Sequence, residues 1–294
     1  MQVSKSLINH LNLKLSDALE QSIRIINVEK LHGGSVNYSF KLQANSQSFF
    51  IKTNKANNHP FIFDIELKGL QKLASTNTLK VPRFILKGDF ENTAYFVLEL
   101  VEQGVESPSF WESFGYQLAA LHQNSDSHFG LAYQNYMGSL AQINTPTDSW
   151  ASFFGNHRIK MQAEMAYAKR LIDSTLLKQI EGLIARMDLL FPKTNPALLH
   201  GDLWSGNFMA NTKQQAVVFD PAVYYGNREM DLAMSLLFGG FDKRFYEAYN
   251  EYFPLEKGWE ERVDLCNIYP LLVHVNLFGA AYSKRLKSAL KKYL

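Results

Sequence analysis

The chain has 294 residues, 46% of them hydrophobic and 20% charged, which is typical of a globular protein that can bury a large core. Its formal net charge of +2, from 30 basic and 28 acidic residues, gives no indication of nucleic acid or a membrane surface as partner, so a small-molecule substrate is expected. The single cysteine, Cys266, excludes an intramolecular disulfide, and the first residues lack the apolar core of a signal peptide, so we expect a cytoplasmic protein.

The first third of the chain has the pattern of an antiparallel sheet. Residues 4–20 carry a loose helical pattern, after which apolar and polar side chains alternate as in half-buried strands. Five strands are expected, over residues 23–28, 38–42, 48–53, 80–86 and 94–101. Phe63, Leu67 and Leu70 repeat at helical spacing, which predicts one helix on this sheet over residues 61–70.

Two glycines lie between the first two predicted strands, in a stretch with four candidate nucleotide-binding residues, Gly33, Gly34, Ser35 and Asn37. A backbone without Cβ atoms can approach a phosphate closely, and its N–H groups can donate to the anion. Taken alone, the two glycines are equally compatible with an ordinary hairpin turn. The phosphate interpretation depends on the charged residues that follow.

A lysine and a glutamate come next, in the order that nucleotide chemistry needs. Lys52 closes the apolar third strand, and a lysine on the inner face of a sheet needs an anionic partner because burying a lone charge is costly. Glu66 lies in the predicted helix, with its side chain expected toward the sheet. We interpret Lys52 as a ligand of ATP phosphates that is held by Glu66. The alternative is a surface ion pair that contributes at most about 1 kcal/mol.

The pattern changes after the fifth predicted strand. Backbone groups there could hold an adenine edge, although a plain connector would have the same sequence, Glu99, Leu100 and Val101. A linker containing glycine and proline follows over residues 103–108. We therefore expect an N-terminal ATP-binding lobe, residues 1–101, and a C-terminal lobe for catalysis and substrate binding, residues 102–294. Helical patterns over 111–122, 156–190 and 230–294 predict that the second lobe is mostly helical.

The strongest chemical signal is an aspartate, an asparagine five residues later, and a second aspartate beyond a short hairpin. Asp202 can accept the proton of an attacking hydroxyl, while Asn207 and Asp220 supply the hard oxygen ligands that Mg²⁺ prefers. The hairpin, predicted from apolar residues 208–210 and 216–219, brings both metal ligands to one edge. Each residue alone is an ordinary turn former, but together with the lysine and glutamate they predict ATP-dependent phosphoryl transfer.

These residues together resemble the active site of the protein-kinase-like fold, which implies a bilobal α+β structure. The loop reads His200-Gly201-Asp202 and the later signal reads Asp220-Pro221-Ala222, where protein kinases have His-Arg-Asp and Asp-Phe-Gly. Eight residues separate Ala222 from Asp231, which leaves no room for a long activation segment that docks a protein substrate. The chain therefore resembles the small-molecule branch, as in aminoglycoside and choline kinases.

Within that branch, the chain from about residue 20 onward is similar to the fructosamine kinase family, also called ketosamine-3-kinases. The matching strings include Gly33-Gly34-Ser35-Val36-Asn37, Leu118-Ala119-Ala120-Leu121-His122, Gln142 with Asn144, Asp148-Ser149-Trp150, His200-Gly201-Asp202-Leu203-Trp204, Glu229-Met230-Asp231 and His274-Val275-Asn276. The resemblance implies phosphorylation of the sugar O3 of ketosamines with ATP and Mg²⁺, after which the labile 3-phosphate decomposes and frees the amine. It places the family's catalytic aspartate at Asp202, its metal ligands at Asn207 and Asp220, and its ATP lysine at Lys52.

Three further residues are candidates for the sugar pocket, Trp204, Tyr225 and Arg228. An aromatic face can pack on a sugar or attract an amine, although core packing and ordinary surface charge explain the same residues equally well. Ser35 stands where some family members have a cysteine, so no thiol switch is expected there. We expect a monomer or weak dimer. The competing hypotheses are a kinase of another small hydroxylated amine and a nucleotide-binding module without turnover.

Overall fold

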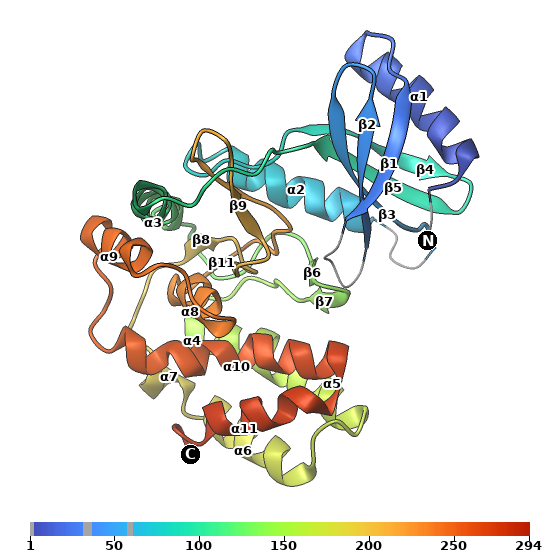
Figure 1. Ribbon diagram of the computed structural model, residues 1–294. Helices are drawn as coiled ribbons and strands as arrows, with labels where there is room; N and C mark the ends of the chain where they lie inside the picture. The colour runs from blue at the N-terminus through green and yellow to red at the C-terminus, as the bar shows by residue number, and fades with distance from the viewer. Residues whose placement is uncertain (1–2, 32–36, 58–60) are drawn as a thin grey trace.

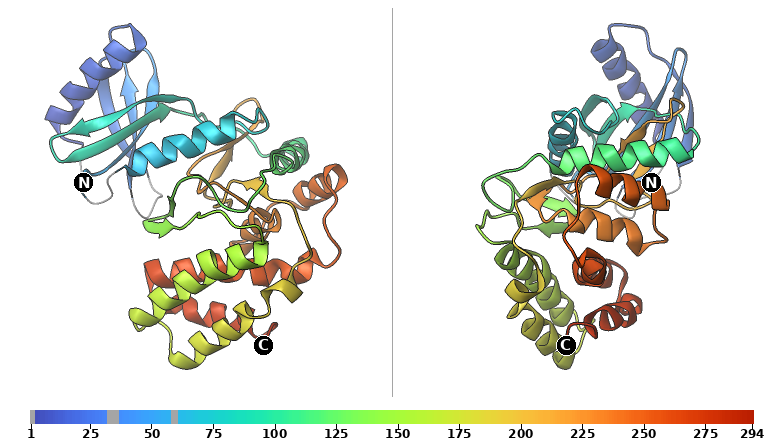
Figure 2. Two further views of the ribbon diagram at one scale, coloured as in Figure 1. Left: turned by 180° about the vertical axis from the view of Figure 1, so that it is seen from behind. Right: turned by 90° about the vertical axis from the view of Figure 1, so that its left-hand side faces the viewer.

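The computed structural model describes residues 3–31, 37–57 and 61–294, and the chain forms two lobes (Figure 1). The N-terminal lobe is a twisted sheet with helices, and the C-terminal lobe is mostly helical (Figures 1 and 2). The bilobal α+β architecture predicted from the sequence is confirmed. Among the helices of the described residues, none has the length and hydrophobicity needed to cross a bilayer.

The N-terminal sheet has five strands in the order β1-β2-β3-β5-β4, each antiparallel to its neighbours. The strands are β1 Ile25–Leu31, β2 Tyr38–Ala44, β3 Ser48–Lys55, β4 Phe84–Phe90 and β5 Thr93–Glu99. Strand β3 is central, and its Lys52 lies between Ser39 of β2 and Phe96 of β5. The backbone that carries Lys52 is therefore held by hydrogen-bonded strands on both sides.

Two helices cover opposite faces of this sheet. Successive side chains of a strand point to opposite faces, and Leu11 of α1 (Lys5–Leu19) packs in one cluster with Tyr95 and Val97. Phe63 of α2 (Ile62–Ala74) packs in another cluster with Phe96. Helix α2 is the helix predicted over residues 61–70. The looser pattern over 4–20 is also a helix, α1, so the lobe has a second helix beside the one expected on the sheet.

Helices dominate the C-terminal lobe. Its elements are α3 Pro108–His122, β6 Asn135–Met137, β7 Leu140–Gln142, α4 Trp150–Ser152, the π-helix η1 Phe153–Lys160, α5 Met161–Ala168, α6 Ser174–Ile184, α7 Met187–Leu190, β8 Ala197–Leu199, β9 Phe208–Ala210, β10 Ala216–Val218, β11 Tyr224–Gly226, α8 Glu229–Leu237, α9 Lys243–Tyr252, α10 Trp259–Phe278, the 3₁₀ helix η2 Ala280–Tyr282 and α11 Ser283–Leu290. Helix α10 contacts α5, α8 and α11 and crosses the middle of the lobe (Figure 1). The short strands pair as β6–β7, β8–β11 and β9–β10, and these ladders position the loops of the candidate site.

Candidate active site

Two short ladders bring together the loop after β8 and the segment after β10. Strand β8 pairs with β11, so Leu199 lies opposite Tyr224. Strand β9 pairs with β10, and beyond this hairpin the N–H of Phe219 donates to the carbonyl oxygen of Asn207 at 3.0 Å. The predicted hairpin is therefore present, and it delivers Asp220 next to Asn207.

Asn207 fixes the position of Asp202. Its buried side-chain amide donates to the carbonyl oxygen of Asp202 at 2.8 Å and to the carboxylate Oδ2 of Asp202 at 2.9 Å. Because both protons of Nδ2 are used in this way, Oδ1 is the side-chain atom of Asn207 left to bind a cation. An amide oxygen beside the Asp220 carboxylate is a donor set suited to Mg²⁺. The residues present therefore fit the magnesium ion that the sequence implies.

A buried aspartate, for which the sequence indicated no role, anchors the start of the loop over residues 200–207, called the catalytic loop because it carries the predicted base Asp202. Asp231 is 1% exposed, and its carboxylate accepts the N–H of His200 at 2.7 Å and the N–H of Gly201 at 2.9 Å. The His122 ring lies on the same carboxylate, with Nε2 3.2 Å from Oδ2, and its Nδ1 lies 2.8 Å from the Tyr249 hydroxyl. Since a carboxylate only accepts, Nε2 of His122 carries the proton and Nδ1 accepts from Tyr249. His122 is thus a structural core residue.

Burial sets the protonation states around this loop. Burial lowers the pKa of His122 and of His200, so both imidazoles are neutral near pH 7. Burial alone would raise the pKa of Asp231, but the hydrogen bonds from the His122 ring and from the backbone N–H of Gly201 lower it below its ordinary value. At Asp202, burial and then the negative charge of Asp220 raise the pKa to about 7. Asp231 is therefore a carboxylate that stays ionised, and Asp202 is one that can exchange a proton near neutral pH.

Lys52 connects the two lobes. Its Nζ lies 2.6 Å from Oε1 of Glu66 in α2 and also contacts Oδ1 of Asp220 in the C-terminal lobe. Lys52 is 4% exposed, so the Lys52–Glu66 pair is buried, as predicted, and is no surface pair. Burial alone would lower the pKa of Lys52, but the carboxylates of Asp220 and Glu66 raise it, so the ammonium group stays charged.

Helix α2 also rests directly on the segment that follows Asp220. Gly69 lies one turn after Glu66, and a Cβ atom there would come within 3.1 Å of the Pro221 ring. The Nζ of Lys72, a turn further on, lies 5.1 Å from the centre of the Tyr225 ring. The helix that carries Glu66 and the segment that carries Asp220 are thus in direct contact.

The rest of the predicted nucleotide-binding set is described only in part. Gly33, Gly34 and Ser35 lie outside the described residues. Asn37 is described, and its Oδ1 accepts a hydrogen bond of 2.8 Å from the Asn54 amide. The residues expected at the adenine edge line a depression of about 250 Å³, whose walls include Glu99, Leu100 and Val101. These placements are compatible with the nucleotide-binding hypothesis.

Trp204 lies within the catalytic loop, two residues after Asp202. Its half-buried indole packs edge-on against Phe238, with ring centres 5.6 Å apart. The ring also lies over Gly206, where a Cβ atom would come within 2.4 Å of it. The loop conformation that holds this indole therefore requires glycine at residue 206.

Tyr225 and Arg228, the other two candidates for the sugar pocket, make contacts within the C-terminal lobe. Tyr225 is buried in β11. The guanidinium of Arg228 donates to the carbonyl oxygens of Phe253, at 2.7 Å, and of Pro254, and it lies 3.7 Å from the centre of the Phe253 ring. A role of these two residues in a sugar pocket therefore stays a prediction from the sequence, with core packing as the alternative.

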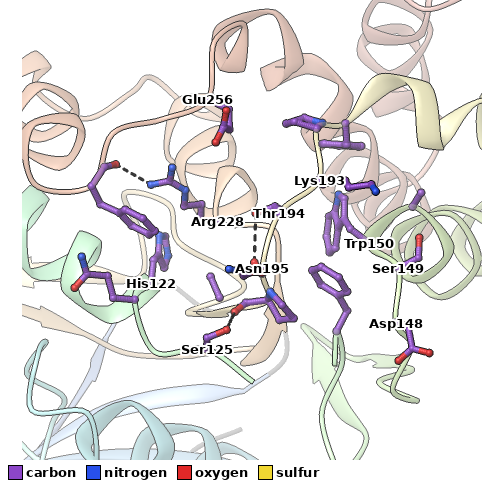
Figure 3. A pocket seen from close by; sticks show the side chains of 18 of the residues that line it. His122, Ser125, Asp148, Ser149, Trp150, Lys193, Thr194, Asn195, Arg228 and Glu256 are labelled. Atoms are coloured by element: carbon purple, nitrogen blue, oxygen red, sulfur yellow. Dashed lines mark hydrogen bonds between the residues drawn. The ribbon is translucent and has the colours of Figure 1, made fainter. Parts of the chain in front are cut away.

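Arg228 also lines a separate cavity of about 960 Å³ in the C-terminal lobe (Figure 3). Its walls include His122, Trp150, Lys193 and Glu256. Asp202, Asn207 and Asp220 are not among the residues that line it. This cavity is therefore distinct from the candidate active site.

A buried Lys–Glu pair on a five-stranded sheet, an Asp–Asn loop and a second aspartate after a hairpin define a phosphotransferase of the protein-kinase-like fold. A mutant of aminoglycoside phosphotransferase APH(4)-Ia, solved with ADP and hygromycin B, shares this fold, with a TM-score of 0.63 and 15% identity over 98% of this chain and 99% of that chain. A solved structure from Haemophilus somnus, described as a candidate fructosamine-3-kinase, has a TM-score of 0.88 and 29% identity over 97% of this chain and 96% of that chain.

The family model for fructosamine kinase matches residues 7–294. A probable ketoamine kinase of Synechocystis is 38% identical over 287 residues, covering 96% of this chain and 95% of that protein. The chloroplastic protein-ribulosamine 3-kinase of Oryza sativa subsp. japonica is 36% identical over 279 residues, covering 93% of this chain and 80% of that protein. The chain therefore belongs to the fructosamine kinase family, as the resemblance in the sequence indicated, and is a kinase that acts on hydroxyl groups.

Proposed function

We propose that the chain transfers the γ-phosphoryl group of ATP to the 3-hydroxyl of a ketosamine, the rearranged adduct of a sugar and an amine. The observation that carries this proposal is the Asp202–Asn207 pair within a chain matched by the fructosamine kinase family over residues 7–294. The name of the rice relative, a ribulosamine 3-kinase, supports position 3 of the sugar. A kinase of another hydroxylated amine is not favoured, because the relatives are named for ketoamines and ribulosamines.

In this proposal Asp202 orients the attacking hydroxyl and accepts its proton. Asn207 supports that role because its amide holds Oδ2 of Asp202 at 2.9 Å and so fixes the carboxylate. Lys52, held by Glu66 at 2.6 Å, binds the phosphates of ATP. This arrangement places the base on one side of the interlobe contact and the phosphate-binding cation on the other.

Asn207 Oδ1 and the Asp220 carboxylate are proposed to hold Mg²⁺, which when bound neutralises charge on the phosphates. The remaining proposed nucleotide contacts are those expected from the sequence, Gly33, Gly34, Ser35, Asn37, Glu99, Leu100 and Val101. The lobe division at residues 101 and 102 belongs to the same proposal. It is supported by the connection between β5 and α3: residues 100–107 are all described, and they form no helix or strand.

Trp204 is a proposed wall of the sugar pocket, and Tyr225 and Arg228 stay further proposed residues of it. The position of Trp204 two residues after Asp202 and its edge-on contact with Phe238 give a rigid aromatic surface beside the proposed base. Such a surface can pack on the apolar face of a sugar or attract a protonated substrate amine. We further propose that the protein works in the cytoplasm as a monomer or weak dimer, which the buried free thiol of Cys266 supports as far as compartment is concerned.

The test is ADP release from Mg·ATP with ribulosyl-lysine and fructosyl-lysine as acceptors. Ribulose, fructose, lysine and an aminoglycoside serve as controls. We expect release with the ketosamines that the controls do not give, and phosphate on O3 of the product by NMR. ATP binding without release on any ketosamine would overturn the substrate assignment, and release with the aminoglycoside alone would favour the other branch of the fold.

A further inference from the structure

The segment that contains Asp220 is held by side-chain hydrogen bonds as well as by backbone hydrogen bonds. Residues 219–223 connect β10 to β11 and belong to no helix or strand. Two of its N–H groups donate to the catalytic loop, from Phe219 to Asn207 at 3.0 Å and from Ala222 to His200 at 2.9 Å. The carbonyl oxygens of Ala222 and Val223 instead accept hydrogen bonds from side-chain amides.

Those amides come from the β6–β7 hairpin. Nε2 of Gln142 donates to Ala222 O at 3.2 Å, and Nδ2 of Asn135 donates to Val223 O at 2.8 Å. Nε2 of Gln142 also donates to Oδ1 of Asn135 at 2.8 Å. Both amides are buried, with exposed fractions of 1% for Gln142 and 3% for Asn135, so water does not replace these bonds. We call Gln142 and Asn135 the amide clamp.

The buried Arg158 fixes the orientation of Asn135, one of the two residues of the amide clamp. Arg158 can only donate, and its Nη2 donates to Oδ1 of Asn144 at 2.7 Å. The Nδ2 group of Asn144 must then face the other way, and it donates to Oδ1 of Asn135 at 2.7 Å. This leaves Nδ2 of Asn135 as the donor to Val223. The guanidinium thus determines which end of the Asn144 amide and of the Asn135 amide donates and which end accepts.

A tyrosine fixes the orientation of Gln142, the other residue of the amide clamp. The hydroxyl of Tyr269 in α10 donates to Oε1 of Gln142 at 2.8 Å, which turns Nε2 of Gln142 toward Ala222. The guanidinium of Arg158 lies 5.5 Å from the centre of the Tyr269 ring and 4.2 Å from that of Tyr224, the first residue of β11. In the described part of the chain Arg158 has no carboxylate partner. Aromatic faces and carbonyl or amide oxygens therefore stabilise its buried charge.

We propose that the amide clamp, oriented by Arg158 and Tyr269, positions Asp220 for metal binding and so sets the affinity for the divalent ion. In a chain with no long activation segment, these side chains supply the partners that hold the residues after the metal-binding aspartate. Gln142, Asn135, Arg158 and Tyr269 are positioning residues, since they act through the backbone of Ala222 and Val223. The inference rests on the proposed function, in particular on Asp220 as a metal ligand.

The test measures metal binding directly, in addition to activity. Mn²⁺ replaces Mg²⁺, and the electron paramagnetic resonance signal of free Mn²⁺ gives the metal bound at a fixed ADP concentration. Tyr269→Phe removes only the hydroxyl that orients Gln142, and Gln142→Met removes the donor while keeping the side-chain length. We expect the Mn²⁺ midpoint to rise about threefold to tenfold, the value of one or two hydrogen bonds. Turnover at saturating Mg²⁺ should stay within about twofold of the starting protein.

Asn276→Leu is the matched control, because it deletes another buried amide, 8% exposed, that donates to Gln162 O at 2.9 Å in another part of the lobe. This control should lower the melting temperature without moving the Mn²⁺ midpoint. If the clamp variants do the same, their role is packing and the inference fails while the proposed function stands. If the starting protein binds no Mn²⁺ with ADP, the proposed metal role of Asp220 fails first. Arg158→Lys keeps the positive charge but loses the planar guanidinium that orients Asn144. Its Mn²⁺ midpoint should therefore rise as in the clamp variants.

Discussion

Gly201 and Ala222 approach so closely that a Cβ atom at residue 201 would lie 2.1 Å from the carbonyl oxygen of Ala222. Gly201 has a φ of +83°, in the left-handed region that favours glycine. The residue before Asp202 therefore fits against the residue two after Asp220 with no space for a side chain. This contact sets the distance between the proposed base and the proposed metal ligand.

Replacing Gly201 by alanine should cost at least about 2 kcal/mol of folding free energy, because it combines left-handed backbone strain with a backbone clash. Turnover should fall with it, since the two halves of the site must separate. Urea denaturation and ADP release measure the two effects. Gly182→Ala is the control: Gly182 is exposed in α6, and no atom lies within 4 Å of the place a Cβ would take, so alanine there should stabilise by about 0.5–1 kcal/mol. Equal stability of the two variants would contradict the argument.

Asp202→Asn should reduce turnover by about 100-fold or more while leaving ATP binding intact, because the variant keeps the shape but loses the base. The Asn207 amide would then meet an amide in place of a carboxylate, which weakens the contact but keeps the loop. Single-turnover kinetics and ATP titration by calorimetry separate the two quantities. Asp17→Asn makes the same change on the exposed face of α1 and should leave both unchanged. Near-normal turnover of the Asp202 variant would remove this residue from the mechanism.

Asp220→Asn should raise the Mg²⁺ concentration for half-maximal activity by about tenfold or more, because a neutral amide replaces a carboxylate ligand. The fold should survive the change. Asp220 has a φ of +55°, a conformation that asparagine adopts readily, so the backbone is not strained further. The measurement is activity against Mg²⁺ at fixed ATP, with circular dichroism to check the fold. An unchanged Mg²⁺ midpoint in a folded variant would refute the metal assignment.

The sequence predicted the parts of the site that follow from residue type and local pattern. Strands β9 and β10 lie where apolar runs flank a polar turn, so the hairpin between Asn207 and Asp220 could be placed in advance. The Lys52–Glu66 pair could be predicted because a lysine on a central strand needs a partner and one helix offered it. These inferences need only short-range periodicity and the high energy of a buried unpaired charge.

The long-range contacts between side chains and backbone could not be predicted in this way. Asp231 caps the catalytic loop from 30 residues away, and nothing near it in the sequence distinguishes it from a surface acid at a helix start. The contacts of Arg228 could not be predicted for a related reason: a guanidinium can donate to a substrate or to a pair of backbone carbonyl oxygens equally well. Its partners, Phe253 and Pro254, lie 25 and 26 residues further on. Such pairings are set by how α8 and α9 pack, which residue type alone does not encode.

Two buried imidazoles should make the fold sensitive to mild acid. Burial lowers the pKa of His122 and His200, so between about pH 6.5 and their folded values the unfolded chain binds more protons than the folded chain. The contribution of each ring to stability therefore falls as the pH decreases, by up to about 1.4 kcal/mol per pH unit, while the raised pKa of Asp202 acts in the opposite direction between about pH 7 and 3.8. The lowered pKa of Asp231 acts in the same direction, but only below its unfolded value of 3.8.

Urea denaturation at pH 7.5, 6.5 and 5.5 measures this slope in the starting protein and in His122→Gln. Glutamine can still donate to Asp231, whose carboxylate lies 3.2 Å from Nε2 of His122, but it does not titrate. The variant should therefore lose stability between pH 6.5 and 5.5 with a slope smaller by up to about 1.4 kcal/mol per pH unit. Above pH 7.5 the imidazole is neutral in both states, so the stability difference between variant and starting protein should be constant there. A variant that keeps the full acid slope would show that His122 is not held neutral by the core.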